Sequence, residues 1–208
     1  MLNTKTVAND TLQALLDNKE EVKGFDQAFM TADALSRRLY LGAISEEVGD
    51  SIDGFIRFWN QVDDENEVPV EEREPIKLFI NSVGGDIYAT FTMIDSIKQS
   101  KTPVWTINTG AAWSGGFFTF IAGHRRIAYP HSSFLFHEGS AANGGDAGKF
   151  RNFAAFYEKI LGELKKHTLE YTKISEEEYD KHVKDDWWML VDDALELGVC
   201  DEISKEHL

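Results

Sequence analysis

Short apolar runs typical of strands alternate with a helical pattern through the middle of this chain. The runs Ile76–Ile80, Val104–Asn108 and Phe134–His137 have the length and apolar content of buried strands, and Ile87–Gln99 between the first two has helical spacing. Such alternation is typical of βαβ units, in which helices pack on a largely parallel sheet. We therefore expect an α/β fold whose functional residues lie where the strands end.

The segments around this central region also carry secondary-structure patterns. Residues 8–23 and Phe150–Tyr171 are predicted helices, Arg38–Gly42 is a predicted short strand, and a last short helix is expected at Asp192–Leu197. A further amphipathic helix is indicated by an apolar stripe at helical spacing, formed by Val48, Ile52, Phe55, Ile56, Trp59 and Val62. Asp63–Pro75 contains seven acidic residues and two prolines, and we predict a solvated surface loop there.

The composition excludes several classes of partner. The 208 residues include 21 basic and 36 acidic side chains, and the net charge of −15 disfavours nucleic acid and anionic membranes. No apolar run approaches the roughly 18 residues of a membrane-spanning helix, and the N-terminal residues have no signal-peptide pattern. Cys200 is the only cysteine, so no internal disulfide can form. We expect a cytoplasmic protein.

Three predicted strand ends carry residues suited to acyl-transfer chemistry. Gly110–Gly116 places Ser114 among small residues just before an apolar helix, Gly84 and Gly85 follow another strand, and His137 ends a third. If these turns converge, the parts of a serine hydrolase are present. The alternatives are a tight turn or helix cap at the serine and a satisfied buried histidine. The elbow motif of the α/β-hydrolases is absent, because Ala112 stands at its first glycine.

Four segments together resemble a known family. They are Ile80–Gly85, Gly110–Phe117, Pro130–His137 and the segment from Asp186 to Asp201. In order and spacing they are similar to the proteolytic subunit of the Clp protease family, serine peptidases of the crotonase-like superfamily. The resemblance implies a crotonase/ClpP-like βαβ superhelical fold for residues 37–208, with a protruding handle helix at about 138–172 for ring–ring contact. Residues 1–36 are expected to form a divergent N-terminal helical extension.

The resemblance also implies roles for individual residues, without a metal or other cofactor. The matching positions are Ser114 as nucleophile, His137 as general base, Asp186 as orienting acid, and Gly85 and Gly115 as N–H donors of the oxyanion hole. These roles fit the chemistry, because a serine hydroxyl needs a base, the base needs a carboxylate, and the oxyanion needs preorganised donors. Adjacent Asp185 is the rival for the acid. The remaining histidines, His124, His131, His167, His182 and His207, are expected to be solvated or structural.

This chain departs from the family pattern at several positions. Val83 replaces a proline, Glu138 replaces a glutamine, and Asp185 replaces an arginine that links subunits across the ring–ring contact. The family has an outer aromatic pocket for loops of a partner ATPase, and the positions matching it here are Lys77 and Thr109. These two residues count against docking of a standard ATP-dependent unfoldase.

The expected function is that of a serine endopeptidase that cleaves polypeptides through an acyl-enzyme inside a self-compartmentalised ring. The resemblance implies a homo-oligomer of seven-membered rings, stacked in pairs through the handles, with peptide lying beside a strand at Ser140–Gly145. One alternative is a bacteriophage capsid-maturation protease of the same fold. Others are a catalytically inactive ring-forming homologue and a crotonase-type acyl-CoA enzyme. The Ser-His-Asp set and the acidic charge count against the last of these.

Overall fold

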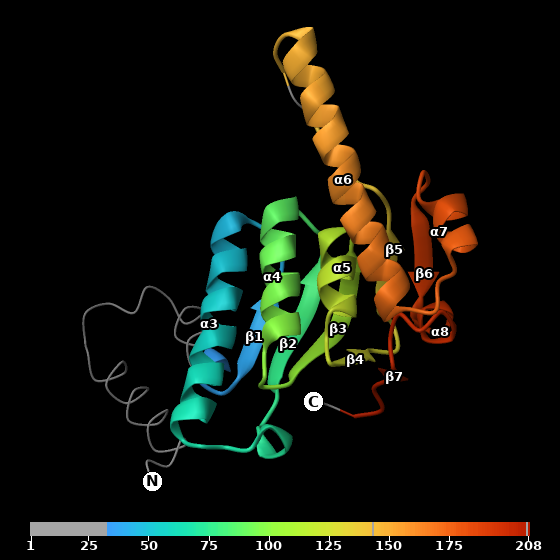
Figure 1. The fold of residues 1–208 in the computed structure, drawn as a ribbon. Coiled ribbons are helices and arrows are strands. Elements are labelled where there is room, and N and C mark those ends of the chain that lie inside the picture. Colours follow the sequence, from blue (N-terminus) through green and yellow to red (C-terminus); the bar gives the residue numbers. More distant parts are fainter. Residues whose placement is uncertain (1–32, 143, 207) are drawn as a thin grey trace, which may run out of the picture.

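The computed structural model describes residues 33–142, 144–206 and 208, and these residues form a mixed α/β fold (Figure 1). The predicted N-terminal helix at 8–23 lies outside the described residues. The strands are β1 (Arg38–Leu41), β2 (Ile76–Ser82), β3 (Val104–Trp113), β4 (Arg125–Ala128), β5 (Ser133–Phe136), β6 (Trp187–Leu190) and β7 (Glu202–Ile203). The helices are α3 (Glu46–Glu65), the 3₁₀ turn η1 (Val70–Glu72), α4 (Ile87–Gln99), α5 (Gly115–Ile121), α6 (Ala147–Tyr171), α7 (Glu176–His182) and α8 (Val191–Glu196).

The long strand β3 holds the sheet together. The main path runs β1-β2-β3-β4-β7 with parallel pairing throughout, and β5 pairs with β3 beyond the point where β4 leaves it. Strand β6 then pairs antiparallel with β5. The sequence placed the end of β3 at Asn108, but the strand continues to Trp113, because Ala112 pairs with Ser82 on one side and Phe134 on the other.

One face of this sheet is covered by helices and holds the main core. Helices α3, α4 and α5 lie side by side across the sheet in Figure 1. Ile76, Leu78 and Ile80 of β2 point into this layer and are fully buried, as are Phe117 and Phe120 of α5. Each such side chain contributes roughly 1.5–3 kcal/mol by burial. The intervening side chains of β2 point to the other face of the sheet, where a smaller hydrophobic cluster forms.

Helix α6 is long and extends beyond the body of the molecule in Figure 1. Its buried residues all lie in the C-terminal half: Ile160, Leu164, His167 and Thr168. Phe150 and Phe156 in the other half are about half exposed. The helix begins at Ala147, three residues before the predicted start, because the Asp146 carboxylate accepts the N–H groups of Gly148 and Lys149 as an N-cap.

The acidic segment at 63–75 is mostly exposed, as predicted, but it begins inside a helix and includes one buried carboxylate. Helix α3 continues to Glu65, and η1 forms within the remainder. Asp63 is only 2% exposed and binds the guanidinium of Arg37 through two hydrogen bonds, of 2.5 and 3.0 Å. Arg73 is also buried and pairs with Asp64. Of the seven acidic residues in this segment, only Asp63 is buried, and the other six are exposed.

The glycine-rich segment at 139–148 was predicted as a loop or a weak strand, and the described residues of Ser140–Gly145 form a loop rather than the strand expected beside the peptide. Strands β4 and β6 were not anticipated from the sequence. No helix in the described residues is long and apolar enough to span a bilayer.

Candidate active site

Ser114 occupies a sharp turn that joins β3 directly to α5. Its φ of 54° and ψ of −121° are rarely adopted by a residue with a side chain. The turn is fixed on both sides, because the Ser114 N–H donates to the Leu135 carbonyl at 2.9 Å and the Ser114 carbonyl accepts from Phe117 at 2.9 Å. The hydroxyl makes no helix-capping bond. Ser114 is thus the N-cap residue of α5 and lies in a tight turn, but within the described residues its hydroxyl caps no helix N–H group and is left available.

The turn at Gly84 and Gly85 packs directly against Ser114. Both glycines have positive φ, of 95° and 152°. A Cβ on Gly84 would lie 2.8 Å from the Cβ of Ser114, and one on Gly85 would lie 2.1 Å from the Ile44 carbonyl oxygen. Only glycine fits such contacts and such backbone angles. The ends of β2 and β3, at Ser82 and Trp113, thus meet at one point although they are 31 residues apart in sequence.

Two unpaired N–H groups lie at this junction. The position that a Cβ of Gly115 would take is 3.6 Å from the Gly85 nitrogen, so the two backbones run past each other closely. Within the described part of the chain, neither the Gly85 nor the Gly115 N–H has a hydrogen-bond partner. Unpaired backbone donors held side by side are suited to binding an oxyanion.

The pairing of β5 with β6 places His137 opposite Asp186. The antiparallel register pairs Phe136 with Trp187, so the next position on each chain brings these two residues together. His137 Nδ1 lies 3.1 Å from Asp186 Oδ1. The side chains are 29% and 56% exposed, respectively. Within the described residues, the Asp185 carboxylate makes no hydrogen bond or ion pair to His137; the Asp185 N–H donates to the His182 carbonyl at 3.1 Å.

The structure brings the predicted residues to one end of the sheet, but not all of the expected hydrogen bonds between them are formed. No hydrogen bond joins Ser114 Oγ to His137 in the described chain. With Nδ1 turned to Asp186, Nε2 of His137 is the nitrogen left for the serine. Hydrogen bonds between catalytic groups are often long before a substrate binds, so the missing bond does not exclude this pair.

Two tryptophans beside the site were missed by sequence reasoning. Trp113 precedes Ser114, and its ring meets the Trp188 ring edge to face at 4.9 Å. Trp113 Nε1 also donates to the Ser133 hydroxyl at 3.0 Å. Trp188 is 53% exposed, which leaves an apolar surface next to Asp186. The available signal was the pair Trp187–Trp188 next to Asp186, since tryptophan is enriched at binding surfaces.

Histidines away from this site make structural contacts. The His167 ring lies under α5, with Nε2 3.0 Å from the Phe118 carbonyl, and burial lowers its pKa. His124 Nδ1 accepts the Val104 N–H at 3.1 Å, and burial likewise lowers the pKa of His124. His207 lies outside the described residues. His131 is exposed and His182 stacks on Trp187, as expected for solvated or structural histidines.

Lys77 lies on the sheet face opposite the helices. The register aligns Lys77, Trp105 and Arg125 across three strands, and both cationic groups sit over the Trp105 ring, at 6.0 and 4.5 Å from its centroid. The neighbouring apolar cluster on this face is formed by Phe79, Ile107 and Ile127, with Trp105, Tyr129 and Leu208 packed against it. Thr109 donates its hydroxyl to the Ile80 carbonyl at 3.3 Å. This face therefore carries a largely buried apolar cluster beside two cationic groups, of which Arg125 is also paired with Glu202 at 2.6 Å.

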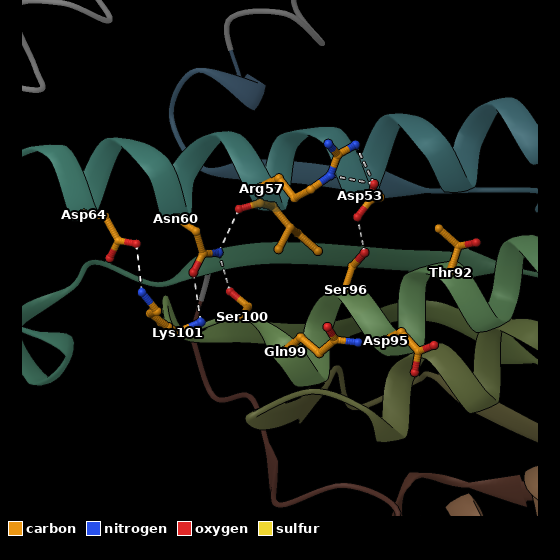
Figure 2. A pocket seen from close by; sticks show the side chains of 11 residues that line it. Asp53, Arg57, Asn60, Asp64, Thr92, Asp95, Ser96, Gln99, Ser100 and Lys101 are labelled. Carbon is orange, nitrogen blue, oxygen red and sulfur yellow. Dashed lines mark hydrogen bonds and ion pairs between the residues drawn. The ribbon is translucent and has the colours of Figure 1, made fainter.

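A groove of about 470 Å³ between α3 and α4 is separate from the site (Figure 2). Its polar groups bind one another: Asp53 pairs with Arg57 and accepts from Ser96, and Asn60 bonds to Ser100 and to the Lys101 N–H. None of the residues predicted for catalysis lines it. The groove is lined mostly by polar side chains of α3, α4 and the turn after α4.

Comparison with known proteins gives one consistent family. The family model described as Clp protease matches residues 68–207, which is more than half of the chain. The ATP-dependent Clp protease proteolytic subunit 2 of Treponema denticola is 30% identical over 136 residues, covering 64% of this chain and 68% of the relative. Proteolytic subunit 1 of Chlamydia abortus is 36% identical over 135 residues (62% and 70%), and the Deinococcus radiodurans subunit 30% over 132 (62% and 65%). The chain spans about two thirds of these relatives and belongs to the Clp protease family.

Proposed function

We propose that this protein is a serine endopeptidase in which Ser114, His137 and Asp186 form the catalytic triad. The observation that carries the proposal is the 3.1 Å contact between His137 and Asp186. His137 directly follows β5, the strand that also binds the backbone of Ser114. The Ser114 N–H binds the Leu135 carbonyl, two residues before His137, so nucleophile and base are attached to one short strand. Membership of the Clp protease family supports the same reaction class.

The proposed chemistry follows from these positions. His137 Nε2 takes the Ser114 proton as Oγ attacks the peptide carbonyl, and Asp186 holds the imidazole in the required tautomer. The Gly85 and Gly115 N–H groups bind the oxyanion of the tetrahedral intermediate. His137 then protonates the leaving amine, which leaves an acyl-enzyme on Ser114. Water, deprotonated by His137, attacks the ester and restores the free serine.

The peptidase domain is assigned to residues 37–208, with residues 1–36 as an N-terminal extension. The domain is proposed to assemble into homo-oligomeric rings, with seven subunits each and two rings joined through α6. The half-exposed Phe150 and Phe156 on the projecting half of this helix support the assignment, because apolar side chains there lack an intramolecular partner surface. Polypeptides are the proposed substrates.

A standard Clp ATPase is not expected to dock on this chain. The named relatives are ATP-dependent proteolytic subunits, but Lys77 and Arg125 place two cations over Trp105 on the outer sheet face. An apolar loop entering there would have to desolvate positive charge. Light scattering of the assembled protein with a Clp ATPase and ATP tests this expectation. A stable increase in mass contradicts it.

A fluorophosphonate probe tests the proposed reaction directly. The assembled wild type is expected to react at one serine, and Ser114→Ala is expected to lose labelling together with peptide hydrolysis, by roughly 10³–10⁶-fold in turnover. Ser51→Ala, at an exposed serine on α3, serves as the matched control. Labelling that persists in Ser114→Ala, or no labelling of wild type of confirmed ring mass, would refute the proposal.

A further inference from the structure

The segment that follows His137 is held to the protein by very little. Residues 138–145 have no regular secondary structure where they are described. Among those described residues, the one hydrogen bond to the rest of the chain runs from the Tyr157 hydroxyl to the Glu138 carbonyl, at 3.2 Å. The side of His137 that faces β5 is well supported, because Phe136 is buried against Tyr179 and Trp187. The chain that follows His137 is held in place by its hydrogen bond with Tyr157.

Tyr157 is itself held in place on α6. Its ring stacks on Phe153, with centroids 6.0 Å apart and planes at 21°. The backbone turns at Gly139, where φ is 75°, and a Cβ there would lie 3.9 Å from the Tyr157 hydroxyl oxygen. Burial and the nearby charge of Glu138 raise the pKa of Tyr157 above its usual value, so the hydroxyl keeps the proton that it donates.

We propose that Tyr157 is a positioning residue for the reaction, which fixes the chain just after His137 and so holds the imidazole in reach of Ser114. The inference rests on the proposed triad. The Glu138 carbonyl belongs to the peptide bond that follows Glu138, one residue beyond His137, so release of this tether frees the backbone that sets the imidazole position. The other contact of the imidazole is with Asp186, whose carboxylate is more than half exposed. A shift of about 1 Å at a reacting group is enough to slow catalysis strongly.

The test compares Tyr157→Phe with Tyr171→Phe in the full-length assembled protein. The first variant removes only the hydroxyl and keeps the ring stacked on Phe153. The second removes a hydroxyl from the same helix, where the ring contacts of Tyr171 with His167 and Lys98 survive. The measurements are kcat and KM on a short fluorogenic peptide, the rate of fluorophosphonate labelling, and hydrogen–deuterium exchange of residues 138–146.

Tyr157→Phe is expected to lower kcat and the labelling rate by a similar factor of about three to ten, the worth of one hydrogen bond, with little change in KM. Exchange at 138–146 should become faster, while Tyr171→Phe behaves as wild type. Rates within a factor of two of wild type, a change in KM alone, or unchanged exchange would overturn the inference. Hydrogen exchange needs no activity, so loss of the tether is measurable even if Ser114→Ala shows that the proposed triad is wrong.

Discussion

Replacing Asp186 with asparagine tests which of two adjacent carboxylates, Asp185 or Asp186, orients His137. Asp186 Oδ1 lies 3.1 Å from His137 Nδ1, whereas Asp185 makes no side-chain bond within the described chain. Asp185→Asn removes the same charge one residue away, from a side chain that is also exposed. The two variants therefore differ only in their relation to His137.

The magnitude follows from the separation and exposure of the pair. Opposite charges about 4 Å apart, as in an imidazolium beside Asp186, attract by about 4 kcal/mol near a protein surface and about 1 kcal/mol in bulk water. At about 1.4 kcal/mol for each factor of ten, these limits correspond to roughly 10³-fold and fivefold in rate. Because Asp186 is 56% exposed, and because asparagine also favours the wrong tautomer of His137, we expect a loss of about 10²–10³-fold.

The assay is kcat on a short fluorogenic peptide, with the unfolding midpoint and assembled mass measured on the same samples. Asp186→Asn should fall by the stated factor, and Asp185→Asn should stay within threefold of wild type. A loss below tenfold for Asp186→Asn would place its carboxylate outside the mechanism. An equal loss in both variants would show that local charge, rather than contact with His137, is what matters.

Three further predictions concern buried groups. Asp63→Ala leaves the buried Arg37 guanidinium without its carboxylate and should lower the free energy of unfolding by about 3–5 kcal/mol in urea titration; a loss below 1 kcal/mol would contradict the network. Because burial lowers the pKa of His167 and its Nδ1 has no hydrogen-bond partner among the described residues, protonation favours the unfolded chain. Stability should decline as pH falls below about 6.5, and His167→Gln should reduce that slope; an unchanged slope would contradict this reading. Burial raises the pKa of Cys200 to about 11, so at pH 8 about one thiol in a thousand is ionised; mass spectrometry should find iodoacetamide adducts only after unfolding.

Local sequence patterns predicted the elements whose neighbours are close in the chain. The apolar spacing placed α4 at its observed bounds, and the run at Ile76 gave the start of β2. Small residues at Gly110–Ala112 favoured a turn, yet they extend β3, because flanking strands supply hydrogen bonds on both sides. Asp63 was predicted to be exposed, but it is buried against Arg37. A local sequence pattern could not show this pairing, because the two residues are 26 positions apart.

The sequence by itself determined which chemistry-bearing residues the strands carry to their ends. Ser114, His137 and the glycine turns follow apolar runs, and the resemblance selected them together with Asp186. Only the tertiary structure decided how they meet. The β5–β6 register sets His137 against Asp186 across 49 positions of sequence, and the strained turn at Ser114 fits only because Gly84 has no side chain. Such contacts depend on strand pairing and close backbone approach, which no local spacing of residue types records.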